Sequence, residues 1–143
     1  MATTDIERFL DAQGHGQYEL TLEEIKNGCK QSHWIWFIFP QMRGLGHSRM
    51  SHVYGIASLD EARKYVENPV LNSHLREITC ALLQHSEKTA AGILGSIDAM
   101  KVRSSMTLFD AICPDDIYND VLLTFYNGRR CSKTLFMIEQ PEY

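Results

Sequence analysis

The residues from Asn68 to Leu83 carry the pattern that most constrains the fold of this chain. Apolar side chains recur there at intervals of three and four residues, at Val70, Leu71, Leu75, Ile78, Leu82 and Leu83. This spacing places them on one face of a helix. Pro69 suits the first turn of a helix, because the N–H that it lacks would have no partner there. The pattern therefore predicts an amphipathic helix that begins near residue 69.

Helix signals of the same kind cover most of the remaining sequence. Two capping boxes, Thr4 with Glu7 and Ser58 with Glu61, predict helix starts near both pairs. Further helices are expected over residues 18–27, 89–94, 96–112, 114–125 and 132–138, and the residues expected to cap them include Ser96 and Ser132. The sequence thus predicts an all-α fold, a compact single-domain bundle of about seven short helices over residues 1–139, followed by a loose tail over 140–143.

The longest apolar run, from Trp34 to Phe39, is rich in aromatic residues. Because no convincing partner strand exists, we expect a buried helix or an extended segment there. On a helix, successive side chains point about 100° apart, so the rings of this run cannot all face one core. Trp34 and Trp36 are therefore candidates for stacking on a planar ring of a ligand, which is worth about 1–3 kcal/mol for a nucleobase. The alternative is ordinary core packing.

Composition and charge argue against several classes of protein. The 143-residue chain has a net charge of −4, which is unlike the basic footprint of a protein that binds a nucleic-acid polymer. No apolar run approaches the roughly 20 residues of a membrane span, and the polar start does not resemble a signal peptide. The four cysteines are scattered, as is typical of reduced thiols. We therefore expect a cytoplasmic protein that binds no membrane.

Acidic residues are absent between Glu24 and Asp60, a gap of 35 residues in a chain with 18 acids. Lysine and arginine give this window a charge of +4, whereas the rest of the chain carries −8. A local positive field on an acidic protein attracts a small anion more readily than a polyanion. The alternative is chance placement in a stretch rich in loops.

The second half of this window, residues 41–51, is a basic loop rich in glycine. Glycine allows the backbone to approach a ligand closely, and arginine offers a planar fork that suits phosphate or carboxylate. A helix that starts near Ser48 would add free N–H groups. The candidate binding residues of this loop are Arg43, Gly44, Gly46, Ser48 and Arg49. The alternative is a surface turn without a ligand.

A second basic segment without acids follows Asp98. Its candidate binding residues are Lys101, Arg103, Ser104 and Ser105. We expect Ile97 and Met100 to face the core, and this spacing also places Ser104 on the buried side. A buried hydroxyl needs a partner, which is either a polar cleft or a backbone carbonyl one turn earlier. We expect the two basic segments to meet in one cleft.

Candidates for catalysis are few. His33 is the candidate acid–base residue, and the sequence does not choose its carboxylate partner. No spacing of His, Cys, Asp and Glu indicates a metal site, and no motif for a redox cofactor is present, so no metal and no cofactor are expected.

The motifs in these segments resemble the family of domains of unknown function numbered 1810. The resemblance rests on the runs SHWIWFIFPQ (32–41), GLG (44–46), YGI (54–56) and KVRSSMTL (101–108). The segments FLDAQ (9–13) and NPVL (68–71) resemble the family as well, so the match covers almost the whole chain. It implies a small, mainly α-helical bacterial protein with a single domain, and it implies no established activity.

Two functions from different classes remain open. The first is a site for an anionic small molecule of the nucleotide or ADP-ribose type, and hydrolysis is the least demanding reaction for it. The second is a protein-interaction module or a homodimer that uses the Trp-rich segment without catalysis. A purely structural role for both clusters is the third alternative.

Overall fold

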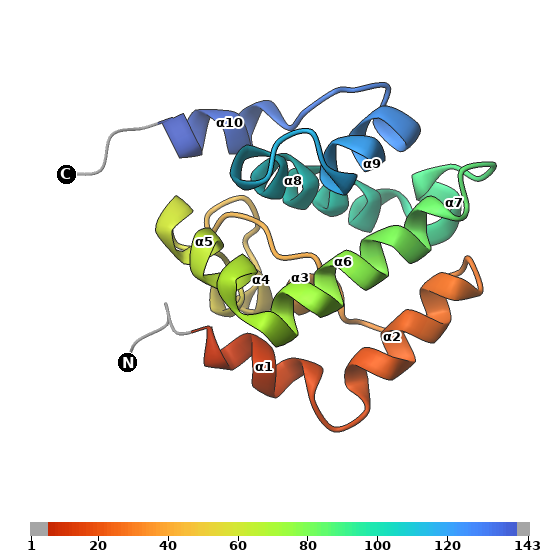
Figure 1. Cartoon of the computed structure of the whole chain (residues 1–143), viewed down its shortest axis with the longest axis horizontal. Coiled ribbons are helices and arrows are strands. Elements are labelled where there is room, and N and C mark those ends of the chain that lie inside the picture. Colours follow the sequence, from red (N-terminus) through yellow and green to blue (C-terminus); the bar gives the residue numbers. More distant parts are fainter. Residues whose placement is uncertain (1–5, 140–143) are drawn as a thin grey trace.

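The computed structural model describes residues 6–139, and ten helices account for most of this range (Figure 1). They are α1 (Glu7–Gln13), α2 (Gln17–Lys26), α3 (Ile35–Ile38), α4 (Arg49–Val53), α5 (Leu59–Glu67), α6 (Pro69–Leu83), α7 (Ala90–Leu94), α8 (Ser96–Ile112), α9 (Ile117–Tyr126) and α10 (Ser132–Glu139). The all-α prediction is confirmed. The count exceeds the predicted seven because short helices such as α3 and α4, of four and five residues, also form. The predicted tail over 140–143 lies outside the described residues.

Capping explains where several helices begin. The Asn68 side chain accepts hydrogen bonds from the N–H groups of Val70 and Leu71, both at 3.0 Å, and so starts α6 at Pro69. Ser58 caps α5 in the same way. Two other predicted caps are wrong, because Ser96 and Ser132 are the first residues inside α8 and α10. The predicted capping residue Thr4 lies outside the described part of the chain.

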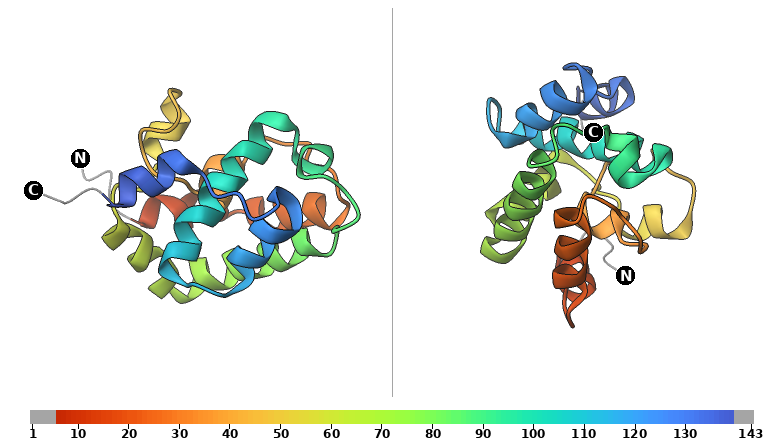
Figure 2. Two further views of the ribbon diagram at one scale, coloured as in Figure 1. Left: turned by 90° about the horizontal axis from the view of Figure 1, so that it is seen from above. Right: turned by 90° about the vertical axis from the view of Figure 1, so that its right-hand side faces the viewer.

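The long helices α6 and α8 organise the molecule. In Figure 1, α6 runs diagonally between α1 and α2 below and α9 above, and it packs against all three. The right-hand view of Figure 2 shows α9 and α10 at one end of the molecule and α1 with α2 at the other. Helix α8 packs against α7, α9 and α10. The core joins large aromatic side chains from many elements: Phe9, Trp34, Tyr65, Phe109 and Tyr118.

The apolar run after His33 forms the short helix α3 and is largely buried. Trp34, Phe37 and Phe39 are 0%, 7% and 1% exposed. The prediction of a buried helix or extended segment is therefore confirmed. The interaction alternative needs this segment as an exposed docking face, and of residues 34–39 only Trp36 is partly exposed.

One prediction about α8 is wrong. Ile97 and Met100, expected in the core, are 69% and 63% exposed. Ala99, Val102, Met106 and Phe109 face the core instead, at the three- and four-residue spacing of the opposite face. The first turn of α8 therefore presents an apolar edge to solvent.

Within residues 6–139, no helix combines the length and the apolar character that crossing a membrane requires.

Candidate functional site

A hollow of about 290 Å³ lies where the loop before α4, the first turns of α8 and the start of α10 come together. Its charged and polar wall consists of Gln41, Lys101, Arg103, Ser104, Ser132 and Lys133. Gly46 and Leu45 line it from the loop, and Ile97 and Met100 form its apolar side. The hollow thus joins part of the glycine-rich loop to the second basic segment.

Three cations face this hollow. Lys101 shares Asp98 with Lys30, at 3.5 and 2.9 Å. Arg103 and Lys133 differ from it: among residues 6–139, neither has a carboxylate within ion-pair distance. The Nε atom of Arg103 is buried and has no hydrogen-bond partner in the same range. The site therefore holds more positive charge than the nearby carboxylates neutralise.

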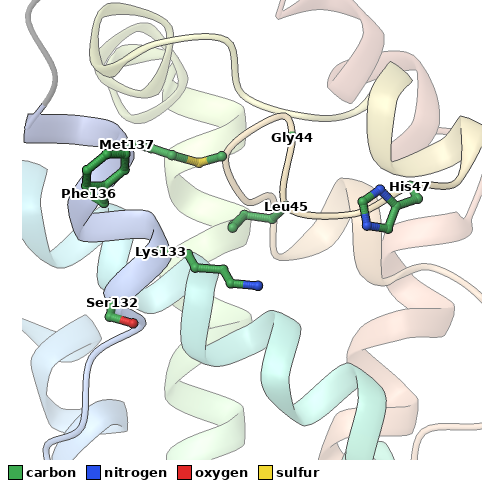
Figure 3. A pocket seen from close by; sticks show the side chains of 7 residues that line it. All are labelled: Gly44, Leu45, His47, Ser132, Lys133, Phe136 and Met137. Atoms are coloured by element: carbon green, nitrogen blue, oxygen red, sulfur yellow. The ribbon is translucent and has the colours of Figure 1, made fainter.

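Packing against α10 and α4 fixes the shape of the glycine-rich loop. Gly44 has a φ of +105°, and a Cβ there would meet the Met137 methyl group at 3.2 Å. A Cβ on Gly46 would lie 2.8 Å from the Ser51 side chain. Both glycines are thus needed for close packing of the loop. Figure 3 shows Met137 reaching Gly44 and Lys133 extending toward the loop, in a second hollow of about 390 Å³ beside the first.

The arginines of the loop do not join the hollow. Arg43 donates from Nε to the carbonyl of His52 at 2.9 Å, so it holds the end of α4. Arg49 is exposed on α4, and Ser48 caps that helix. None of the three lines the hollow, so the predicted meeting of both arginines with Lys101 and Arg103 is wrong. On α4, Arg49 and His52 are exposed, and the Ser51 hydroxyl donates to the carbonyl of Ser48.

A third hollow, of about 380 Å³, adjoins the first and shares Ile97 and Lys101 with it. His33, which is exposed, and the partly buried Trp36 line it. The Lys101 ammonium lies 5.3 Å from the centre of the Trp36 ring. The ring of Trp36 is thus placed beside a cation and an open space, as a stacking residue would need.

Trp34 takes no part in this arrangement. It is 0% exposed, and its Nε1 donates to Oε1 of Glu24 at 2.9 Å. The prediction that Trp34 stacks on a ligand is wrong, because both faces of a fully buried ring are occupied by protein atoms.

The two serines of the second basic segment differ in their surroundings. Ser104 lines the hollow, and its hydroxyl lies 3.2 Å from the Met100 carbonyl one turn earlier. The predicted bond to a backbone carbonyl is therefore present. Ser105 is 0% exposed and does not line the hollow.

Three residues of the site had no sequence signal that linked them to it. Cys131, Ser132 and Lys133 enter through the start of α10, which packs on α8. Because no motif links residues 131–133 to the two basic segments, only the packing of α10 shows that they belong together. Over residues 6–139, no group of three His, Cys, Asp or Glu side chains could hold a metal ion.

The profile of a family of proteins of unknown function, DUF1810, matches residues 3–138. The chain belongs to this family. The crystal structure of the conserved hypothetical protein Rv1873 from Mycobacterium tuberculosis is similar to it, with a TM-score of 0.92 and 36% sequence identity. The similarity covers 96% of this chain and 98% of Rv1873. No match was found among curated proteins. The family resemblance expected from the sequence motifs is thus confirmed, and it assigns no activity.

Proposed function

We propose that this DUF1810 protein binds an anionic small molecule in the hollow between loop 41–46, α8 and α10. The observation that carries the proposal is that Arg103 and Lys133 line one hollow and that neither forms an ion pair with a carboxylate among residues 6–139. A guanidinium fork and an ammonium group are the side chains that most often hold phosphate. Positive charges in a hollow with apolar walls also raise the local concentration of anions.

The adjoining hollow favours a ligand of the nucleotide or ADP-ribose type. Because both hollows share Lys101 and Ile97, one ligand could place its phosphate beside Arg103 and its ring beside Trp36. His33 lines the ring end of this path and remains the predicted acid–base residue. The proposal is limited to binding, because His33 has no carboxylate partner among residues 6–139.

Calorimetric titration and thermal unfolding with AMP and ADP-ribose test this proposal, with adenosine as the uncharged control. A ligand at ten times its Kd stabilises the folded state by about 1.4 kcal/mol, which raises Tm by roughly 4 °C for a chain of this size. We expect this rise for the phosphorylated ligands and none for adenosine. No heat and no rise in Tm with either phosphorylated ligand at millimolar concentration would contradict the proposal.

Charge removal locates the site. Lys133 is exposed, so Lys133→Ala should leave the fold intact and weaken AMP binding about tenfold, which corresponds to about 1.4 kcal/mol. Lys26→Ala is the matched control, because it removes the same charge from an exposed position at the end of α2. Equal losses of affinity in both variants would show general attraction of anions rather than a site at α10.

A further inference from the structure

The side chain of Cys131 lies on the wall of the same hollow. Its backbone is fixed on both sides: its N–H donates to Oγ1 of Thr107 at 3.0 Å, and its carbonyl accepts from the N–H of Leu135 at 3.1 Å. Cys131 therefore stands directly before the first residue of α10, and its sulfur accepts hydrogen bonds from the N–H groups of Lys133 and Thr134 in the first turn of that helix. The residue is 7% exposed, so its small open area faces the hollow.

Ser104 can stabilise either protonation state of this sulfur. Its Oγ lies 3.3 Å from Sγ of Cys131 and 3.2 Å from the Met100 carbonyl. The single hydroxyl hydrogen goes to the carbonyl when the sulfur is protonated, and turns to the sulfur when it is a thiolate. Burial raises the pKa of the Cys131 thiol, but hydrogen bonds from Ser104, Thr134 and Lys133 outweigh it, so the pKa is lowered.

The surroundings of the sulfur point independently to a negatively charged ligand. Arg103 lines the same wall, and its buried Nε has no hydrogen-bond partner among residues 6–139. A buried guanidinium nitrogen without a partner is costly, so the positive charge of Arg103 is incompletely compensated by the protein, and an anion in the hollow that this residue lines would offset that charge. Lys133, two residues after the cysteine, contributes a second cation to the hollow.

We propose that Cys131 is the nucleophile of this hollow and that its substrates are anionic electrophiles. Such a molecule carries a phosphate or carboxylate group beside an electrophilic carbon. In the covalent step, an electron pair of the thiolate forms the S–C bond, and the leaving group departs with the electrons of the bond that breaks. The thiolate is the attacking form, so the thiol proton passes to solvent before this step. The anionic half of this inference rests on the proposed function, and the nucleophilic half does not.

Alkylation with two small reagents tests both halves in one molecule. Iodoacetate carries a carboxylate and iodoacetamide does not, and each transfers its CH₂ carbon to sulfur with loss of iodide. Cys29 and Cys80 are exposed free cysteines and serve as internal references. Mass spectrometry of the digested native protein gives the alkylation rate at each cysteine as a function of pH.

We expect the alkylation rate at Cys131 to rise with pH around a midpoint below about 8.5, the pKa that is usual for cysteine. Relative to Cys29 and Cys80, the ratio of the iodoacetate rate to the iodoacetamide rate should be about tenfold higher at Cys131. Lys133→Ala should reduce this preference and Lys26→Ala should not. Ser104→Ala should shift the pH midpoint at Cys131 upward without changing the preference for iodoacetate.

The possible failures are distinguishable. If Cys131 stays unlabelled while Cys29 and Cys80 react, or reacts only at alkaline pH, its assignment as a nucleophile is wrong. The proposal that the hollow binds AMP would not be affected by that result. A fast reaction at low pH with no preference for iodoacetate would overturn the class of substrate and the anion site together.

Discussion

The carboxylate of Glu24, the last acid before the window without acids, holds the start of that window in place. Its Oε1 accepts hydrogen bonds from the N–H groups of Gln31 and Ser32 and from Nε1 of Trp34, at 2.8, 3.0 and 2.9 Å. Burial raises the pKa of this carboxyl, but the hydrogen bonds from Ser32, Gln31 and Trp34 outweigh it and lower the pKa to about 2. A single charge thus positions the chain that leads to His33.

Replacing this carboxylate should destabilise the fold in a way that depends on pH. Glu24→Gln keeps one oxygen for the three N–H donors but removes the charge and puts an NH₂ group toward the Ser32 hydroxyl, which should cost about 1–3 kcal/mol at pH 7. Since the folded pKa lies below the unfolded one, the contribution of Glu24 is complete above about pH 4.5 and is lost as the pH falls toward 2. Urea unfolding at pH 7, 4 and 3 checks this.

The control for this comparison is Glu67→Gln on the exposed end of α5. We expect the difference between wild type and Glu24→Gln to shrink between pH 4.5 and 3, and the Glu67→Gln difference to stay small throughout. A Glu24→Gln cost that is unchanged at pH 3 would show that its hydrogen bonds do not depend on the charge.

At the scale of residues, the sequence marked both tryptophans but did not distinguish them. Trp34 is buried because its indole N–H finds Glu24, ten residues earlier, whereas Trp36 has no such partner among residues 6–139 and faces a hollow. No local pattern encodes this difference, because it depends on how α2 lies against the loop that follows it.

Among the elements, α6 follows its sequence signal most closely. Asn68 ends α5 and starts α6, and its side chain satisfies two N–H groups at the start of the longer helix. Asn68→Ala should therefore lower the unfolding free energy by about 1 kcal/mol. Asn68→Asp should lower it much less, because aspartate also caps helices. Urea denaturation of the two variants measures this, and equal stabilities would show that the cap contributes nothing.

Helix α8 shows what periodicity alone does not resolve. Apolar residues occur on more than one face of this helix, so its sequence does not decide which face is buried. The face expected to be buried carries Ile97 and Met100, and both are exposed in the structure. Helices α5, α7, α9 and α10 pack on α8, which buries a continuous run from Ser104 to Asp110. The Tyr126 hydroxyl of α9 also donates to the carbonyl of Ala99 in the first turn, but Ile97 and Met100 are exposed and border the hollow.

The exposed edge of α8 predicts unequal effects of substitution. Ile97→Ser and Met100→Ser should each change the unfolding free energy by less than about 0.5 kcal/mol, as is usual for surface positions. Leu108→Ala, at a fully buried position of the same helix, should cost about 2–5 kcal/mol. A large loss of stability in Met100→Ser would contradict the orientation of α8 described above.

At the scale of the whole molecule, the candidate site draws on three segments that are far apart in sequence: residues 41–46, 97–104 and 131–133. Charge patterning indicated the first two, because residues 25–59 and 99–109 contain no acids. The third depends on the docking of α10 against α8 and on the contact of Met137 with Gly44. Tertiary packing therefore completed a site of which the sequence had marked two of the three segments.

Affinity for an anion in this hollow should depend on salt. Raising the ionic strength from about 0.1 to 1 M shortens the Debye length from about 10 to 3 Å, which weakens attraction by partly exposed cations. We expect the Kd for AMP to increase severalfold over this range and to increase less in Lys133→Ala. Calorimetric titration at the two salt concentrations measures both, and an affinity that does not change with salt would speak against a charged site.

The most direct test of an anion site at this junction is a titration of the ¹⁵N-labelled protein with AMP, followed by NMR. Shifts of backbone amide signals should concentrate in residues 41–46, 97–104 and 131–133, and should saturate at a single Kd. Shifts that are absent, or that spread over exposed lysines such as Lys26 and Lys64, would contradict an anion site between loop 41–46, α8 and α10.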